Sequence, residues 1–162
     1  MAPRTGPTHT TERTFLLPEE PIERAHIIIE SGMHHPDWRR RPVPSAKAGR
    51  AAMHGLGTMT RAARRAERLN AHDMAFTAIS DAVADLIHLA DWYCFTPDEM
   101  ATWHHRTLAV PDNPLPMSMP RKLVRLTFIL GNLLQLASAY DWGEDGIIDQ
   151  ACMHFYAEEN GR

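Results

Sequence analysis

The sequence predicts an all-α protein, a bundle of five or six helices that contains a duplicated helical hairpin. Apolar residues recur at the helical spacing in one segment after another. Prolines and glycines separate these segments at lengths that suit helices. In addition, DLIHLADWYCFTPDE at residues 85–99 is echoed by NLLQLASAYDWGEDG at residues 132–146. Such an echo is typical of a chain that builds its core from two similar units.

The composition is that of an ordinary globular protein with one core. The chain has 162 residues, of which 44% are hydrophobic and 23% charged. No apolar run approaches the ~18 residues that a membrane span requires, and the first residues lack the apolar stretch of a secretory signal. We therefore expect a cytoplasmic protein without membrane contact. The two cysteines, Cys94 and Cys152, indicate neither a disulfide framework nor a zinc site, and we expect both to be buried thiols.

The N-terminal part divides into an arm and a first helix. Residues 1–13 are polar and carry two prolines, so we expect a flexible arm, followed by a single domain at 14–162. The first helix is expected in LPEEPIERAHIIIESG, which has acids in its first turn and Gly32 as its stop. Three closely spaced prolines then require an extended connection.

Ser45 is the predicted N-cap of the second helix, which is expected from Ala46 to about Leu69. Small and apolar residues form one stripe along this segment. Gly55 and Gly57 mark a weak point at which the helix is expected to kink or break.

The third helix is expected at 71–93, where apolar residues again follow the helical spacing. A fourth helix begins in FTPDEM, in which Thr96 is the predicted N-cap, Pro97 takes the first helical position and Glu99 completes a capping box. We expect it to run to about Leu108, where VPDNPLPMSMP ends it.

The two-helix pattern then recurs, so that residues 71–108 and 121–159 form two hairpin copies. Leu86 of the first copy corresponds to Leu133 of the second. A true duplication and two hairpins that converged on one packing rule both explain the match. In either case one hairpin cannot bury its apolar face alone, whereas two can share a four-helix core. Leu86 and Leu133 are therefore both expected to be buried.

Basic residues are concentrated in one part of the chain, although the net charge is only −3. Between residues 39 and 68 the single acid is Glu67. The candidate binding surface consists of Arg50, Arg61, Arg64, Arg65 and Arg68. The last four lie at i, i+3, i+4 and i+7, so they share one helix face that suits an acidic protein or a phosphate-bearing ligand. The alternative is a solvated face in the arginine-biased proteome of a high-GC bacterium or its phage.

The third helix carries the residues that most resemble metal ligands. Asp81, Asp85 and His88 lie at i, i+4 and i+7. Two carboxylates one turn apart can bind a hard cation such as Mg²⁺, and an imidazole can join them for a softer metal. The alternative is that the three residues form the solvated face of an amphipathic helix. Farther along the chain, His154 and Glu158 are expected to form a surface pair.

The acidic pair on an apolar helix, followed by LADWYCFTPDEM, resembles the later half of the all-α nucleotide pyrophosphohydrolases of the MazG type. That resemblance implies a site in which Asp81 and Asp85 bind Mg²⁺ and position a nucleoside triphosphate. The family also uses a Glu-x-x-Glu motif on the preceding helix. Here that segment reads HGLGTMTRAARRAERL, with arginines at the corresponding places, so only Asp81 and Asp85 carry over.

We expect a non-catalytic binding or regulatory protein that uses the arginine face and needs no cofactor. The alternative is a divalent-metal nucleotide hydrolase using Asp81 and Asp85, which requires further carboxylates facing Asp85. Sequence-specific nucleic-acid binding is not expected, because no helix-turn-helix, zinc-finger or RNA-binding motif is present. The sequence does not determine the oligomeric state, and a homodimer is one of the alternatives.

Overall fold

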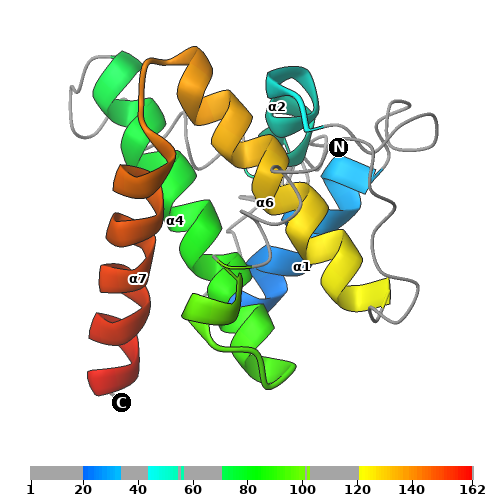
Figure 1. The fold of residues 1–162 in the computed structure, drawn as a ribbon, viewed down its shortest axis with the longest axis vertical. Coiled ribbons are helices and arrows are strands. Elements are labelled where there is room, and N and C mark those ends of the chain that lie inside the picture. The colour runs from blue at the N-terminus through cyan, green and yellow to red at the C-terminus, as the bar shows by residue number, and fades with distance from the viewer. Residues whose placement is uncertain are drawn as a thin grey trace, which may run out of the picture.

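The structure is a computed structural model that describes residues 20–33, 44–54, 56, 71–100, 102 and 121–161. Its helices are α1 (Pro21–Met33), α2 (Ala46–His54), α4 (Ala71–Trp92), α6 (Arg121–Ala139) and α7 (Glu144–Asn160) (Figure 1). A further short helical segment at 97–100 follows α4. Every element in these ranges is helical, so the predicted all-α bundle of five or six helices is confirmed.

Several predicted boundaries agree with the structure. The helix α1 ends next to the predicted stop at Gly32, and α2 begins directly after Ser45. The helix α2 ends at His54, just before the two glycines that were expected to weaken it. The predicted arm at 1–13, the stretch that runs to Leu69 and the end of the fourth helix lie outside the described residues.

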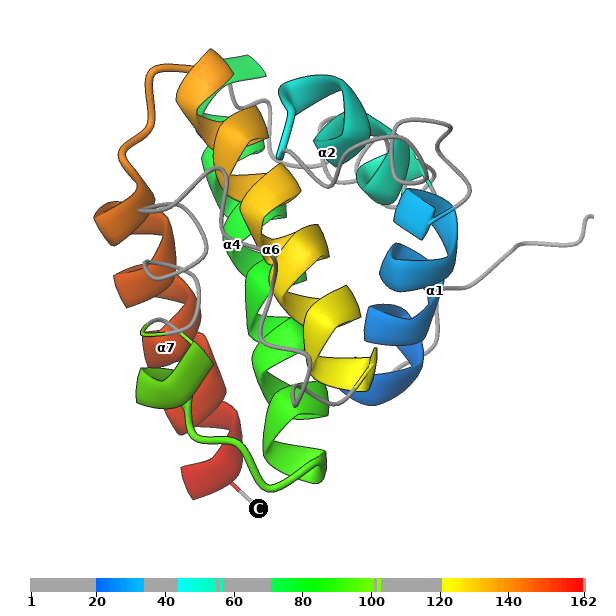
Figure 2. The ribbon, with the colours of Figure 1, turned by 45° about the vertical axis from the view of Figure 1, so that its right-hand side comes forward.

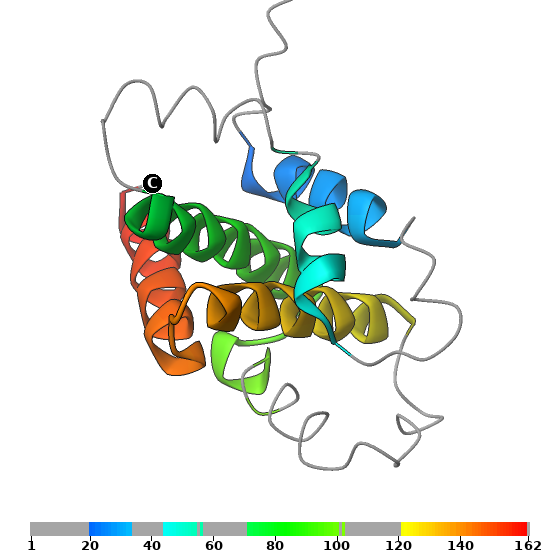
Figure 3. The ribbon, with the colours of Figure 1, turned by 90° about the horizontal axis from the view of Figure 1, so that it is seen from above.

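The helix α4 lies inside the bundle and is covered by neighbours on several sides. In Figure 2 the helices α7, α4, α6 and α1 follow one another across the molecule, and α2 lies over α6 and α1 in Figure 3. The helix α7 packs mainly along α4 and only lightly against α6, although it directly follows α6 in the sequence. The two helices of the second predicted hairpin, α6 and α7, therefore do not pack mainly on each other. Instead, α7 packs on α4, which belongs to the first predicted hairpin.

Two turns of the same geometry end α4 and α6. Cys94 and Asp141 both adopt left-handed backbone conformations, with φ of 66° and 62°. The N–H of Phe95 donates to the carbonyl of Ala90 at 2.9 Å, and that of Trp142 donates to Ala137 at 3.0 Å. Both are Schellman turns, which satisfy the last carbonyls of a helix. Whether the shared turn reflects a duplication stays a prediction.

The cysteine prediction is wrong for Cys94, which is exposed at its turn, and Cys152 is only half-buried. Cys94 occupies the left-handed position that follows the end of α4 in its Schellman turn. The capping box that follows is confirmed. The Thr96 N–H donates to the Glu99 carboxylate at 2.7 Å, and the Glu99 N–H donates to Thr96 Oγ1 at 3.2 Å.

The helix α2 approaches the backbone of α6 very closely. A Cβ atom added at Gly49 would lie 2.3 Å from the carbonyl oxygen of Asn132, so only glycine fits at this crossing. Ser45 is confirmed as the N-cap, because its Oγ accepts the N–H of Ala48 at 3.2 Å. The N–H of Ser45 in turn donates to Oδ1 of Asn132 at 3.0 Å. The start of α2 is thus fixed to α6 by a hydrogen bond and by close packing.

One apolar core joins the helices, and its centre is formed by α4 and α6. Leu86 and Leu133 are both fully buried, at 0% exposure, as the sequence predicted. Both belong to a continuous cluster that also includes Ile28 of α1 and Ile147 of α7. A core shared by four helices explains why the echoed positions are apolar in both halves of the chain.

We expect Leu86→Ala and Leu133→Ala each to lower the free energy of unfolding by about 2–5 kcal/mol, because each leaves a cavity in the shared core. Urea unfolding measures the effect. Met153→Ala is the control, since the Met153 side chain is 63% exposed and should change stability by less than about 0.5 kcal/mol. Equal effects of the three substitutions would contradict the position of the core.

Two glycine substitutions should change stability in opposite directions. Gly49→Ala should destabilise the protein by about 1–3 kcal/mol, because the new methyl group meets the backbone of α6. Gly146→Ala lies in the first turn of α7 with no heavy atom within 4 Å of the added Cβ, and should stabilise it by about 0.4–1 kcal/mol. Thermal unfolding of both variants tests the pair, and a stabilising Gly49→Ala would disprove the close contact.

Candidate functional site

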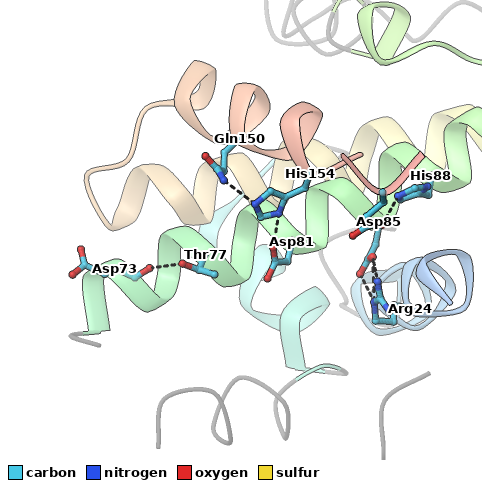
Figure 4. A network of polar contacts seen from close by, with 9 residues as sticks. Arg24, Asp73, Thr77, Asp81, Asp85, His88, Gln150 and His154 are labelled. Atoms are coloured by element: carbon cyan, nitrogen blue, oxygen red, sulfur yellow. Dashed lines mark hydrogen bonds and ion pairs between the residues drawn. The ribbon is translucent and has the colours of Figure 1, made fainter. Parts of the chain in front are cut away.

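Two charged or titratable residues of α4, Asp85 and His88, face other helices. Asp85 is 5% exposed and His88 is 6% exposed, so the interpretation of a solvated face is wrong for these two residues. The reason is that α1 and α7 both pack on α4 and cover this side of it. Figure 4 shows the resulting network of side chains from the three helices.

Arg24 of α1 binds Asp85 of α4 through two nitrogens. Its Nη2 lies 2.7 Å from Oδ1 of Asp85, and its Nε lies 3.0 Å from Oδ2. This geometry is the bidentate arrangement that a guanidinium forms with a carboxylate. Burial raises the pKa of Asp85 to about 6, while the hydrogen bonds and charge of Arg24 oppose the rise. The pKa of Arg24 is raised in turn, chiefly by its hydrogen bond to Asp85.

Two histidines connect α4 to α7. His154 Nδ1 lies 2.9 Å from Oδ1 of Asp81, and His88 Nε2 lies 2.7 Å from Oε2 of Glu158. The predicted surface pair of His154 with Glu158 is therefore wrong, because each contacts a residue of α4 instead. Burial raises the pKa of Asp81, and His154 opposes this effect.

These contacts bear directly on the metal hypothesis. Asp81, Asp85 and His88 lie on one helix as expected, but each is paired with a different residue of α1 or α7. Opposite Asp85 lies Arg24, where the hydrolase alternative requires further carboxylates. Within the described ranges, no three histidine, cysteine or acidic side chains are grouped as a metal site requires. The hypothesis stays a prediction, in which a divalent ion would have to displace Arg24.

The predicted arginine surface includes Arg50, which lies within the described residues and is exposed on α2. Lys47 and His54 are also exposed and lie three residues before and four residues after it, so the three share one face. We call Lys47, Arg50 and His54 the basic face of α2. The opposite side of α2 is buried and consists of Ala48, Gly49 and Ala52. The other four predicted surface residues, Arg61, Arg64, Arg65 and Arg68, lie outside the described residues.

Sequence reasoning missed Arg24 and Glu158 as partners of the α4 residues. They lie 61 and 70 residues away from Asp85 and His88 respectively, and no local pattern connects them. Lys47 and His54 could have been added to Arg50 from their spacing alone, because a helix with Ser45 as its N-cap places them on one face.

Comparison with known proteins gives no relative for this arrangement: no family model matches the chain, and neither a curated protein nor a solved structure does. The resemblance to the pyrophosphohydrolases therefore stays a prediction from the sequence. Among the described helices, none combines the length and apolar character that crossing a bilayer requires.

The energetic role of the Arg24–Asp85 pair can be tested by removing one partner or both. Asp85→Ala should lower the free energy of unfolding by about 3–5 kcal/mol, because it leaves the guanidinium largely buried without its partner. Arg24→Met combined with Asp85→Leu should cost much less, since two apolar side chains replace both charges. Urea unfolding of this double variant and of the single variants Arg24→Met and Asp85→Leu completes a double-mutant cycle. If the double variant is as unstable as the sum of the single ones, the two residues are not coupled.

Proposed function

We propose that the protein is a non-catalytic binding protein of the cytoplasm that contacts an acidic protein or a phosphate-bearing partner through the basic face of α2. The observation that carries this proposal is the exposure of Lys47, Arg50 and His54 on one side of a helix without a single acidic residue. A surface of one charge sign attracts partners of the opposite sign and accelerates their association.

The attachment of α2 supports this role. The hydrogen bond between Ser45 and Asn132 and the close contact at Gly49 fix α2 on α6. A charged face on a fixed helix loses little conformational freedom when it binds a partner. In the proposal, Arg61, Arg64, Arg65 and Arg68 also contribute to binding the partner, because arginine supplies a planar fork of donors for carboxylate or phosphate.

The polar residues of α4 also favour binding over catalysis. Asp85 has both carboxylate oxygens within hydrogen-bond distance of Arg24, and His88 is buried against Glu158. Side chains that hold helices together in this way serve the stability of the fold. The same residues would otherwise be the first candidates for acid–base or metal chemistry.

Charge reversal tests the proposal with immobilised polyanions as probes. Arg50→Glu should elute from heparin at lower salt than the wild type. The slope of log binding constant against log salt concentration should become shallower by about one, the value of one ionic contact. Arg125→Glu is the matched control, because Arg125 is exposed near the start of α6 and the net charge changes equally. Immobilised polyglutamate in place of heparin tests whether carboxylates alone suffice.

Reversal of Arg64 and Arg65 to glutamate should weaken retention further without lowering the melting temperature. A lower melting temperature with unchanged retention would mean that these arginines form internal ion pairs. Equal retention of the Arg50 and Arg125 variants would contradict the basic face of α2 as the contact. Magnesium-dependent hydrolysis of a nucleoside triphosphate by the wild-type protein would contradict the non-catalytic assignment and favour the hydrolase hypothesis.

A further inference from the structure

The outer side of α7 carries an exposed stripe of acidic and apolar side chains. Asp145, Asp149, Met153 and Tyr156 follow one another at intervals of four, four and three residues, so they lie on one face of the helix. All four side chains are exposed. We call them the outer stripe of α7. The other side of α7 is buried against the bundle and is apolar.

The apolar part of the outer stripe resembles an interface more than an ordinary surface. Within the described ranges, three large apolar side chains are exposed, and two of them are Met153 at 63% and Tyr156 at 51%. These two lie three residues apart on α7, so they form one patch. Both residue types are enriched in protein interfaces, and tyrosine gives a large contact area at little cost in conformational freedom. Contact with another protein would cover this patch.

The charge of α7 opposes the pairing of two such stripes. The helix contains five acidic residues and neither lysine nor arginine. Two copies that met through their α7 helices would bring like charges together, which costs free energy at an interface. A partner that fits the outer stripe therefore has to be basic, and it has to leave room for the side chains of Met153 and Tyr156.

The basic face of α2 has the complementary features. Lys47 and His54 are seven residues apart, as are Asp149 and Tyr156, so each face extends for about 10 Å along its helix. Ala51 lies among the basic side chains and is partly exposed, so the centre of this face is shallow. A tyrosine ring can pack beside such a small residue and can accept an arginine guanidinium on its face.

The two faces lie on different sides of the bundle. The helix α7 packs mainly on α4 and more lightly on α6, whereas α2 packs on α6 and α1. In Figure 2, α7 lies at one edge of the molecule, and α2 lies beyond α6 on the other side. The two faces therefore do not meet within one copy. A contact between them joins two copies head to tail, and each pair keeps one unused face of each kind.

We propose that the acidic partner of the basic face of α2 is a second copy of this chain, which contributes the outer stripe of its α7. The inference rests on the proposed function, because it names the partner of the same basic face. The carboxylates of the stripe meet the lysine and arginine of α2, and Met153 and Tyr156 pack around Ala51. The contact is small and partly charged, so the association is weak and depends on protein concentration and on salt.

Sedimentation velocity of the full chain tests this contact. At up to about 0.5 mM protein, the average mass of the wild type should rise with concentration at about 50 mM salt and return to that of the monomer at about 500 mM salt. Arg50→Glu should raise the dissociation constant about tenfold or more, and so should Met153→Ala combined with Tyr156→Ala. Trp92→Ala is the matched control and should associate as the wild type does, because Trp92 is 70% exposed but lies on α4 outside both faces.

A mixture of the two defective variants distinguishes a head-to-tail contact from a symmetric one. The Arg50→Glu copy keeps an intact outer stripe, and the copy with Met153→Ala and Tyr156→Ala keeps an intact basic face. One intact contact should therefore form between them, so the mixture should contain dimers of one copy of each, although neither variant associates by itself. A symmetric contact through α7 predicts normal association of Arg50→Glu and no dimers in the mixture.

Three results would refute the second copy as the partner: a wild type that stays monomeric at low salt, association that Arg50→Glu leaves unchanged, or a mixture without dimers. Retention on heparin separates this failure from that of the proposed function. If the wild type binds heparin through Arg50 but stays monomeric, the basic face binds a different partner and self-association alone is wrong. If Arg50→Glu changes neither retention nor association, both proposals are wrong.

Discussion

The enclosure of α4 determines how the rest of the bundle is organised. A helix covered by α1, α6 and α7 has little of its surface left for water, yet this one carries Asp85 and His88 on a covered side. A buried carboxylate is costly unless a cation and hydrogen bonds accompany it. Arg24 meets this requirement, and α1 must therefore lie where its guanidinium reaches Asp85. The helix α7 is held on α4 by its buried side chains Ile147, Ala151 and Phe155 and by the two histidine contacts.

The opposite side of the bundle is assembled by a different principle. Where α1, α2 and α6 meet, small residues such as Gly32, Gly49 and Ala52 let the helices approach closely. Close backbone approach leaves no space for added atoms, and the hydrogen bond from Ser45 to Asn132 fixes where α2 begins. One side of the molecule is thus held by charged and polar pairs and the other by steric fit. Only the first of these can respond to a change in pH.

Much of the local structure could be predicted because its causes are local. The N-cap at Ser45 and the capping box at Thr96 depend on residues three positions apart, and both are present in the structure. The burial of Leu86 and Leu133 followed from helical spacing. The environment of Asp85 could not be predicted, since an acid opposite an apolar stripe normally faces water. Its burial depends on α1 and α7, whose positions are decided by contacts between distant parts of the chain.

The candidate sites differ in the same way. The basic face of α2 requires only helix geometry and one buried side, so Arg50 was found from the sequence. The connections of α4 to Arg24, His154 and Glu158 join residues from both halves of the chain, and no spacing rule reveals them. The direction taken by α7 was also missed, because a Schellman turn at Asp141 specifies how a helix ends and leaves open which neighbour the next helix covers.

The long-range pairing of α4 also has a consequence for how the chain acquires its structure during synthesis. Asp85 can pair with Arg24 soon after α4 emerges from the ribosome, but His88 has to wait for Glu158, which is 70 residues farther along. Until then one side of α4 lacks its cover. Contacts of such sequence separation slow folding and join distant segments into one cooperative unit. A nascent chain that stalls before α7 would carry an incompletely covered central helix, which is the kind of surface that chaperones recognise.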